Sequence, residues 1–270
     1  MPFEEWHLTW ISNALGVVFA ILILALLRRV VCGSKSTGLG NTVLVLGHTG
    51  AGKTALVRRL LRGGFPTTCV SMKEAVFDGV RLACEAEDGS TAGGPLRVVE
   101  FPGHPRLRSA QRIGASLAEA SVILFVINSA DISKAHVGTC AEYLYDVMTN
   151  EDVDRRRPAL MVVCSQSDRD AAASKAYLRA QLEKELSKLK ETRPSLAAEG
   201  DDAGASAAIL LGRKGRDFEF AEDCPCETKF CEFSAKPDEA GKSGGGVLRA
   251  RADWRRDWHE VEVFIRDFIA

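Results

Sequence analysis

The sequence has almost no excess of charge of either sign. Its 35 lysine and arginine residues are nearly matched by 36 aspartate and glutamate residues, which leaves a formal net charge of −1 at pH 7. Proteins that bind nucleic acid mainly through charge are strongly basic, so this balance predicts no direct, sequence-specific contact with nucleic acid. Two basic clusters, residues 155–157 and 249–256, leave lipid headgroups or ribosomal RNA as local alternatives, but a solvated face is favoured.

The sequence also lacks a disulfide framework, although it contains eight cysteine residues. The cysteines are scattered, and Cys84 and Cys164 lie inside apolar runs, as is typical of reduced thiols in a cytosolic domain. Cys224, Cys226 and Cys231 lie close together in the sequence. No histidine or fourth cysteine lies nearby at ligand spacing, so the pattern does not favour a zinc site.

Charged residues are absent from residues 8–27, and residues 15–27 are wholly apolar. A helix of ~20 apolar residues is long enough to span a bilayer. Trp6 and Trp10 lie at the N-terminal edge of the run, where indole rings favour the headgroup layer. We therefore expect a transmembrane helix over residues 8–27.

Two alternatives explain this apolar run less well. A cleaved signal peptide would have basic residues before the run and a small-residue cleavage site after it, and neither is present. A buried core helix would have a polar face. Arg28 and Arg29 follow the run, and positive residues favour the cytosolic side. We therefore expect residues 1–7 to be lumenal, residues 28–41 to be a cytosolic linker, and residues 42–270 to form a cytosolic domain.

One stretch, G-H-T-G-A-G-K-T, matches the phosphate-binding loop pattern G-x-x-x-x-G-K-T. Residues 42–46 before it form a β-branched run that predicts a buried strand, and residues 55–62 after it have helical periodicity. Glycines let backbone N–H groups surround a phosphate, and the helix N-terminus adds partial positive charge. The predicted nucleotide-binding residues here are Gly47, His48, Thr49, Gly50, Ala51, Gly52, Lys53, which reaches the β- and γ-phosphates, and Thr54, whose hydroxyl ligates Mg²⁺.

The rest of the chain alternates strand and helix signals. Further strands are predicted at residues 76–84, 96–101, 122–128, 159–164 and 229–233, the first two forming a hairpin. Helices are predicted at about residues 106–118, 140–148, 171–189 and 254–269. Such alternation predicts an α/β fold with a six-stranded, mostly parallel, doubly wound sheet, and a ligand site beyond the carboxyl ends of the strands.

Three more stretches follow successive strands in the order that a guanine-nucleotide switch protein requires. Residues 100–103 resemble D-x-x-G, in which Gly103 would sense the γ-phosphate and Glu100 would hold Mg²⁺ through water. Asp168 matches the last position of N-K-x-D and would accept two hydrogen bonds from guanine. The third stretch, S-A-K, contacts the guanine oxygen and comprises Ser234, Ala235 and Lys236. Together they favour a small GTPase fold over a P-loop kinase or ATPase.

Small GTPases also carry a hydroxyl between the phosphate loop and the third strand, which ligates Mg²⁺ and closes on the γ-phosphate. Ser71 lies at a spacing close to that of Arf-like proteins, and Thr68 is the competing candidate. An exposed loop without a metal role is the remaining alternative.

The apolar N-terminal run, the Arf-like motifs and F-P-G-H at residues 101–104 resemble the signal recognition particle receptor beta subunit family. The most specific stretch is L-G-R-K-G-R-D-F-E-F at residues 211–220, because ordinary small GTPases have no such insertion. A polar, alanine-rich stretch at residues 194–206 precedes it, so we expect an insertion over about residues 190–228. The resemblance extends over residues 8–270.

The resemblance implies GTP and Mg²⁺ as cofactors, the receptor alpha subunit as partner, and a single-pass location in the endoplasmic reticulum membrane with the domain facing the cytosol. The ribosome or the translocon are further partners that it suggests. An autonomous Arf-like GTPase acting in vesicle traffic is the alternative. The transmembrane run and the insertion favour the receptor subunit.

Several residues depart from the usual GTPase pattern. Glu100 replaces Asp, and Ser165 and Gln166 replace Asn and Lys, which predicts weaker metal contact and lower nucleotide affinity or base discrimination. His104 stands where many GTPases carry a glutamine that orients water, and it is the candidate catalytic residue. We therefore expect GTP hydrolysis to be slow, or to be stimulated by a partner.

Overall fold

The structure is a computed structural model, and its described residues exclude the N-terminal apolar run. It describes residues 40–62, 68–82, 94–107, 110–198, 209–213, 215–236 and 254–269. The predicted transmembrane helix at 8–27 and the linker up to residue 39 lie outside these residues. Among the helices that are described, none combines the length and the apolar character that crossing a bilayer requires.

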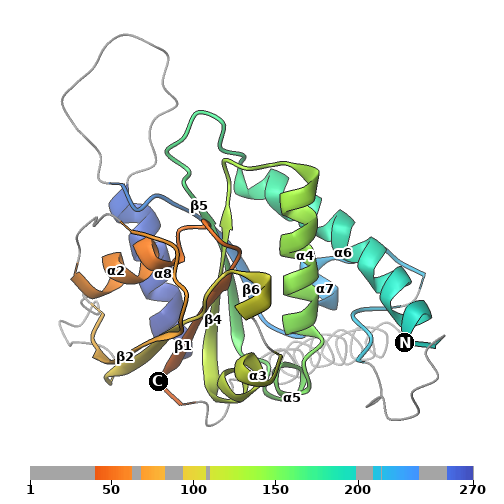
Figure 1. The fold of residues 1–270 in the computed structure, drawn as a ribbon, viewed down its shortest axis with the longest axis horizontal. Coiled ribbons are helices and arrows are strands. Elements are labelled where there is room, and N and C mark those ends of the chain that lie inside the picture. Colours follow the sequence, from red (N-terminus) through yellow and green to blue (C-terminus); the bar gives the residue numbers. More distant parts are fainter. Residues whose placement is uncertain are drawn as a thin grey trace, which may run out of the picture. The chain divides into compact units, whose positions relative to one another are not determined.

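A six-stranded sheet forms the centre of the domain (Figure 1). The strands are β1 (Thr42–Gly47), β2 (Ala75–Val80), β3 (Leu96–Glu100), β4 (Ala120–Asn128), β5 (Ala159–Ser165) and β6 (Thr228–Phe233). Their order is β2-β3-β1-β4-β5-β6, and β2 pairs antiparallel with β3 while all other pairs are parallel. The predicted six-stranded, mostly parallel α/β fold is confirmed.

The central strands are apolar along their whole length because both faces of the sheet are covered. Every residue of β1 and β5 is buried. Leu44 and Leu46 of β1 point into one core cluster, and the intervening Val43 and Val45 point into the other. This alternation is the period-two geometry of a strand, so each strand supplies both cores.

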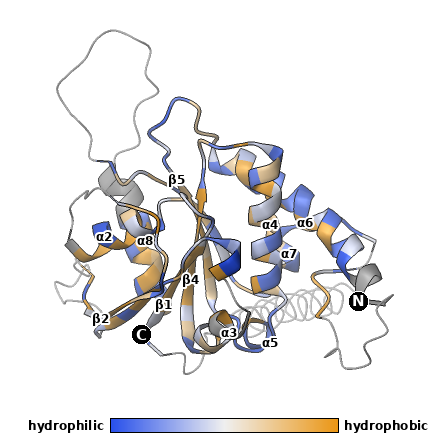
Figure 2. Ribbon diagram, viewed as in Figure 1, coloured by the Kyte–Doolittle hydropathy of each residue, from blue (hydrophilic) through white to orange (hydrophobic). Residues whose placement is uncertain are grey.

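Helices lie on both faces of the sheet (Figure 1). The cluster around Leu44 includes residues of α3 (Ala110–Glu119), α4 (Lys134–Met148), α5 (Glu151–Arg156), α6 (Lys175–Ala198) and α7 (Phe220–Asp223). The cluster around Val43 includes residues of α2 (Lys53–Arg62) and α8 (Trp254–Phe268). Figure 2 shows the apolar faces of these helices turned toward the apolar strands.

Helix α4 begins at Lys134, earlier than the predicted start at residue 140. Ser133 caps this helix, since its side chain accepts a hydrogen bond from the backbone N–H of His136. Gly138 in the first turns lowers helix propensity and conceals the start of the apolar pattern. The short helices α5 and α7 were not predicted, because six and four residues are too few to show a clear period.

Helix α6 also differs from its prediction, since it begins at Lys175 and continues to Ala198, through residues assigned to the polar insertion. The stretch at residues 211–220 then returns along this helix. The backbone N–H of Phe218 donates to the Ser187 hydroxyl at 2.8 Å, and that of Phe220 donates to Glu183 Oε1 at 3.1 Å. Both phenylalanines are buried, so the predicted insertion is packed against the domain where it is described.

Candidate functional site

The phosphate loop connects β1 to α2 at the carboxyl edge of the sheet, next to β4 (Figure 1). Gly47 has a φ of 137°, and a Cβ atom there would lie 2.1 Å from the carbonyl oxygen of Val126. A glycine is therefore required for β1 to turn into the loop beside β4. The loop lies where strand order reverses in the sheet, which is the usual ligand position in open α/β folds.

Lys53, the first residue of α2, is buried beneath this loop. Its Nζ donates to the carbonyl oxygens of Gly47 at 3.0 Å and His48 at 2.8 Å. These hydrogen bonds hold the ammonium group inside the curve of the loop. A buried positive charge at a helix N-terminus forms a site for an anion.

Gly103 approaches the same loop from the end of β3. A Cβ atom on this residue would lie 2.4 Å from the Thr49 nitrogen and 2.6 Å from Lys53 Nζ. No side chain fits at such distances, so position 103 requires glycine. The close approach places this backbone beside the phosphate loop.

Thr54, which follows Lys53 in α2, lies together with Ser71 and Glu100. The hydroxyl oxygens of Thr54 and Ser71 are 3.0 Å apart, and the Ser71 hydroxyl donates to Glu100 Oε1 at 3.3 Å. The Thr54 hydroxyl also donates to Glu100 Oε1. Glu100 is buried. Its side chain is one methylene longer than the usual Asp, and it still contacts the hydroxyl of Thr54, the residue that was predicted to ligate the metal. Hydroxyl and carboxylate oxygens are hard ligands of the kind that Mg²⁺ prefers.

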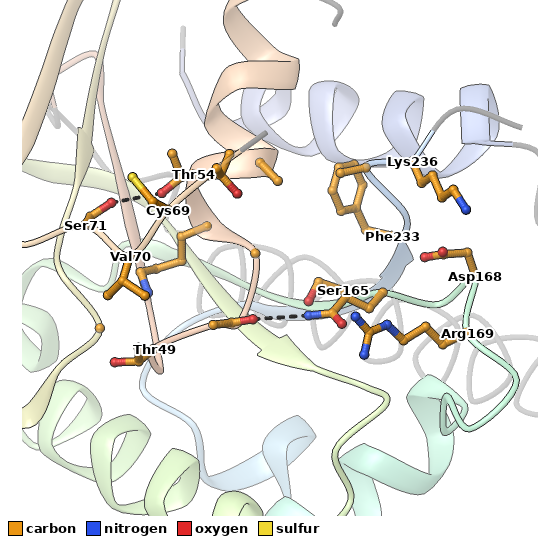
Figure 3. A pocket seen from close by; sticks show the side chains of 18 of the residues that line it. Thr49, Thr54, Cys69, Val70, Ser71, Ser165, Asp168, Arg169, Phe233 and Lys236 are labelled. Atoms are coloured by element: carbon orange, nitrogen blue, oxygen red, sulfur yellow. Dashed lines mark hydrogen bonds between the residues drawn. The ribbon is translucent and has the colours of Figure 1, made fainter. Parts of the chain in front are cut away.

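A cavity of about 850 Å³ joins this cluster to the loops after β5 and β6. Figure 3 shows Thr49, Thr54 and Ser71 at one end of it and Asp168 and Lys236 at the other. The remaining residues that line the cavity are Gly50, Gly52, Lys53, Ala55, Thr68, Cys69, Val70, Glu100, Gly103, Ser165, Gln166, Arg169, Asp170, Ala171, Phe233 and Ala235. The site is therefore elongated, with different chemistry at its two ends.

Asp168 and Ser234 form the far end of the cavity. The Ser234 hydroxyl donates to Asp168 Oδ1 at 2.8 Å and accepts from the backbone N–H of Lys236 at 3.2 Å. Asp168 is exposed. Two stretches far apart in the sequence are thus joined at the predicted base-binding end.

Ser165 and Gln166 connect this far end to the phosphate loop. The Ser165 hydroxyl contacts the carbonyl oxygen of Ala51 and lies 3.0 Å from that of Ile127. Gln166 Nε2 donates to the carbonyl oxygen of Gly50 at 3.1 Å (Figure 3). The usual Asn and Lys are absent, but position 165 still braces the phosphate loop through a hydroxyl group.

Two side-chain oxygens of the cavity lining are buried and have no hydrogen-bond partner within the described residues. They are Thr49 Oγ1 and Gln166 Oε1. Buried polar atoms are nearly always paired in folded proteins. Their gathering at one site fits a polar ligand that supplies the missing hydrogen bonds.

The structure does not bring every predicted residue to the cavity wall. Gly47, His48, Ala51 and Ser234 are not among the residues that line it. His104 is exposed and is not among the residues that line the cavity, and its Nδ1 accepts from the backbone N–H of Arg106 at 3.3 Å. Between the two alternatives for the switch hydroxyl, Ser71 lies in the Thr54 cluster, whereas Thr68 lines the cavity as an exposed residue.

His48 connects the phosphate loop to α4. Its ring packs edge-on against His136 with centroids 5.2 Å apart, and its Nδ1 lies 3.1 Å from the Thr49 carbonyl oxygen. His136 is largely buried and lies 3.8 Å from Asp131. Burial lowers the pKa of His136, which Asp131 opposes and His48 reinforces. A hydrogen bond from Ser133 lowers the pKa of Asp131.

Sequence reasoning missed several residues that line the cavity. Arg169, Asp170 and Phe233 flank predicted positions, and their place beside a strand end was the available signal. Cys69 and Val70 come from the segment before Ser71, which has no periodic pattern from which its course could be predicted.

Comparisons with known proteins agree with this geometry. The family model described as "Signal recognition particle receptor beta subunit" matches residues 39–223. The signal recognition particle receptor subunit beta of Rattus norvegicus is 31% identical over 246 residues, which cover 91% of this chain and 86% of the rat protein.

Solved structures share the fold. A chain in the structure of the mammalian SRP receptor is 27% identical with a TM-score of 0.63, covering 84% of this chain and 99% of that one. A chain of the SRb-GTP/SRX complex from Chaetomium thermophilum is 19% identical with a TM-score of 0.56, covering 74% of this chain and 95% of that one.

Proposed function

The chain belongs to the signal recognition particle receptor beta subunit family, and from this membership we propose that it is the GTP-binding, membrane-anchored subunit of that receptor. In this role it holds the receptor alpha subunit at the endoplasmic reticulum for co-translational protein targeting. An autonomous Arf-like GTPase in vesicle traffic is the alternative, which the family match does not favour.

GTP with Mg²⁺ is the ligand that the cavity fits best. Lys53 and the backbone of the phosphate loop would hold the phosphates, and Thr54, Ser71 and Glu100 would hold the metal, with Glu100 acting through water. Asp168, together with the backbone of residues 234–236, would bind guanine. The unpartnered Thr49 and Gln166 oxygens support a polar ligand at the phosphate loop. When bound, Mg²⁺ supplies charge neutralisation at the phosphates.

The observation that carries the partner proposal is an apolar surface beside the metal cluster. Val70, Met72 and Val76 are 56%, 69% and 42% exposed. Val70 and Met72 flank Ser71, whose hydroxyl contacts Thr54 and Glu100, and Val76 lies in the strand that follows, β2. An exposed apolar group attached to a nucleotide-sensing residue is suited to a partner whose binding depends on the nucleotide. We assign this surface to the alpha subunit.

The membrane part of the proposal rests on sequence. Residues 8–27 are assigned as the single membrane span, residues 1–7 as lumenal, and residues 28–41 as the cytosolic tether of the domain at 42–270. Residues 190–228 are assigned as the family-specific insertion, whose described part packs on α6. Contacts with the ribosome or the translocon would be made through the alpha subunit complex.

Hydrolysis by the chain alone is proposed to be slow. His104 is exposed, its Nδ1 accepts from the backbone N–H of Arg106, and residue spacing alone assigns no arginine finger. A partner that supplies such an arginine accelerates phosphoryl transfer by ~10³–10⁵. His104→Ala should then lower the partner-stimulated rate and spare GTP binding. Single-turnover hydrolysis by the full chain is the measurement. Turnover of several per second without a partner would favour the alternative, an autonomous Arf-like GTPase.

The function is tested by asking which protein binds the GTP-loaded chain. Full-length chain in detergent, loaded with GTP or with GDP, is immobilised and offered purified receptor alpha subunit or vesicle coat proteins. We expect alpha-subunit binding with GTP and much weaker binding with GDP. Met72→Ser should reduce this binding without changing nucleotide affinity, and Met161→Leu, a buried change far from the surface, is the control. Preferential binding of coat proteins would overturn the proposal.

Orientation is tested separately with sealed microsomes. Protease added outside should digest the domain and leave only the segment up to about Arg28. Protection of the domain until detergent is added would show that the proposed topology is reversed.

A further inference from the structure

His136 is a buried polar ring that the nucleotide site does not use. It lies in the first turn of α4, and 8% of its side chain is exposed. Asp131 Oδ2 lies 3.8 Å from its Nδ1, and Cys140 Sγ lies 3.7 Å from its Nε2. Its backbone is fixed as well, because the N–H donates to the Ser133 hydroxyl at the helix cap. A ring with neighbours at both nitrogens has one orientation, which suits it to position another group.

His48 of the phosphate loop is the group that this ring contacts. The two rings pack edge-to-face, with centroids 5.2 Å apart and planes at 85°. This is a favoured geometry for paired rings. Burial lowers the pKa of His136, against the opposing effect of Asp131, so this ring is neutral at pH 7. His48 belongs to the phosphate loop but is not among the residues that line the cavity. Its ring therefore connects the loop to α4.

The peptide between His48 and Thr49 is held by two further parts of the site. Its carbonyl oxygen accepts from Lys53 Nζ at 2.8 Å. The backbone of Gly103 crowds the same peptide, since a Cβ atom there would lie 2.5 Å from the His48 carbonyl carbon and 2.4 Å from the Thr49 nitrogen. The His48 ring also lies against the loop backbone, with Nδ1 3.1 Å from the Thr49 carbonyl oxygen. Movement of this ring would therefore disturb the carbonyl group that holds the Lys53 ammonium.

We propose that His136 positions the phosphate loop for nucleotide binding by packing against the His48 ring. The contacts run from α4 through the two rings to the His48 carbonyl group and Lys53. His136 is a positioning residue, because it acts on the nucleotide through His48. The inference rests on the proposed function, since it takes a guanine nucleotide as the ligand of the cavity.

Loss of the ring contact should act on the rate of nucleotide release. Without it the His48 side chain gains rotational freedom, and the loop samples conformations in which Lys53 is not held beneath it. An edge-to-face ring pair contributes enough free energy to change an equilibrium or rate by about 2- to 12-fold. We therefore expect His136→Ala to accelerate release of bound nucleotide by a factor in this range.

The experiment measures release of a fluorescent GDP analogue from the full-length chain in detergent with Mg²⁺, after addition of excess unlabelled GTP. His136→Phe keeps a ring at this position and should release the analogue at nearly the wild-type rate. His136→Gln keeps a polar side chain without a ring and should release it as fast as His136→Ala. If Gln rescues the rate and Phe does not, polar contacts of position 136 control the loop and the proposal is wrong.

A double-mutant cycle tests whether the two rings act together. His48→Ala and His136→Ala each remove the same contact, so the double variant should release nucleotide no faster than His48→Ala alone. The backbone carbonyl group that accepts from Lys53 remains in all of these variants. Independent, multiplying effects of the two substitutions would overturn the proposal.

Met148→Ala controls for a general loss of stability. Met148 is buried at the opposite end of α4, about 18 Å along the helix from His136, and contacts Cys224. This variant should unfold at lower urea concentration and still release nucleotide at the wild-type rate.

Failure of this inference is distinct from failure of the proposed function. A wild-type chain that binds no guanine nucleotide would overturn the proposed function and the inference with it. A wild-type chain that binds the nucleotide, together with an unchanged release rate in His136→Ala, would overturn the inference alone. If His136→Ala does not fold, the comparison of His136→Phe with His136→Gln decides the question.

Discussion

The two ends of the nucleotide cavity are built in different ways. At the phosphate end, Lys53, Glu100 and Gly103 are buried and held by close backbone approaches and short polar contacts. At the base end, Asp168 and Lys236 are exposed and connected through the single hydroxyl of Ser234. The phosphate end also has the fuller motif match, while the base end retains one position of N-K-x-D.

This difference indicates which part of the site tolerates substitution. When a buried, charged group loses a partner, its full desolvation penalty is left uncompensated. At an exposed group, water replaces part of the lost interaction. The base end can therefore exchange Asn and Lys for Ser165 and Gln166 and still contact the phosphate loop. We expect the phosphate end to carry most of the affinity and the base end to carry selectivity.

The largest effect is expected at Lys53. Lys53→Ala removes a buried ammonium that would contact the phosphates, a charge-assisted interaction worth ~1.5–3 kcal/mol or more. The dissociation constant for GTP should rise by about tenfold to more than a hundredfold, and GTP-dependent binding of the alpha subunit should fall with it. Titration of a fluorescent GTP analogue is the measurement. Arg58→Ala, an exposed change on the same helix, should leave affinity unchanged. If the alpha subunit still binds after the nucleotide is lost, the chain is a membrane anchor whose partner binding does not depend on GTP.

A smaller effect on affinity, with a clear effect on selectivity, is expected at Asp168. Asp168→Ala removes the acceptor predicted for the guanine N–H groups, so the preference for GTP over ATP should fall by about tenfold. Competition binding with both nucleotides measures this ratio. Asp170→Ala removes an equal charge from the same wall and should leave the ratio nearly unchanged. An unaltered ratio in Asp168→Ala would show that selectivity lies elsewhere.

The connection between the two ends is expected to contribute less. Ser165→Ala removes one neutral hydrogen bond to the phosphate loop, worth about 0.5–1.5 kcal/mol. Nucleotide release should become a few-fold faster, which stopped-flow displacement can measure. Ser167→Ala is the matched control, because the Ser167 hydroxyl has no partner within the described residues. Equal release rates in both variants would show that Ser165 does not brace the loop.

The smallest effect is expected on the pH dependence of stability, through His136, which packs against His48 at the phosphate end. Burial lowers the pKa of His136 below its ordinary value of 6.5, so the unfolded chain binds this proton more readily than the folded one. The stability from neutral His136 is present above pH 6.5 and is lost as pH falls through the folded-state pKa. His136→Gln should make the dependence of unfolding free energy on pH shallower in this window. Urea unfolding measures it, and exposed His259→Gln should keep the original slope.

The sequence was sufficient to predict the sheet, because β1, β4 and β5 are continuous apolar runs that end at turn residues. The phosphate loop was predicted for the same reason, since its residue spacing specifies its own geometry. Helix α5 was not predicted, because its six residues depend on the Asn150 cap rather than on periodicity.

The contact between Ser165 and the phosphate loop could not be predicted either. It joins positions 114 residues apart, and the pattern alone indicated only that Asn was missing. The path of residues 211–220 likewise depends on side chains of α6 that accept its backbone N–H groups. Local patterns therefore predict elements, whereas contacts between distant loops require the folded chain.

Strand β2 makes the protein prone to aggregation before it binds its partner. It is at the edge of the sheet, and within the described residues no strand pairs with its outer side. Val76 on this strand and the neighbouring Met72 expose apolar side chains beside a row of open backbone groups. Such an edge templates pairing with other chains and promotes aggregation. Newly made chains that outnumber their partner would therefore be candidates for chaperone retention and degradation, so the supply of one subunit would set the lifetime of the other.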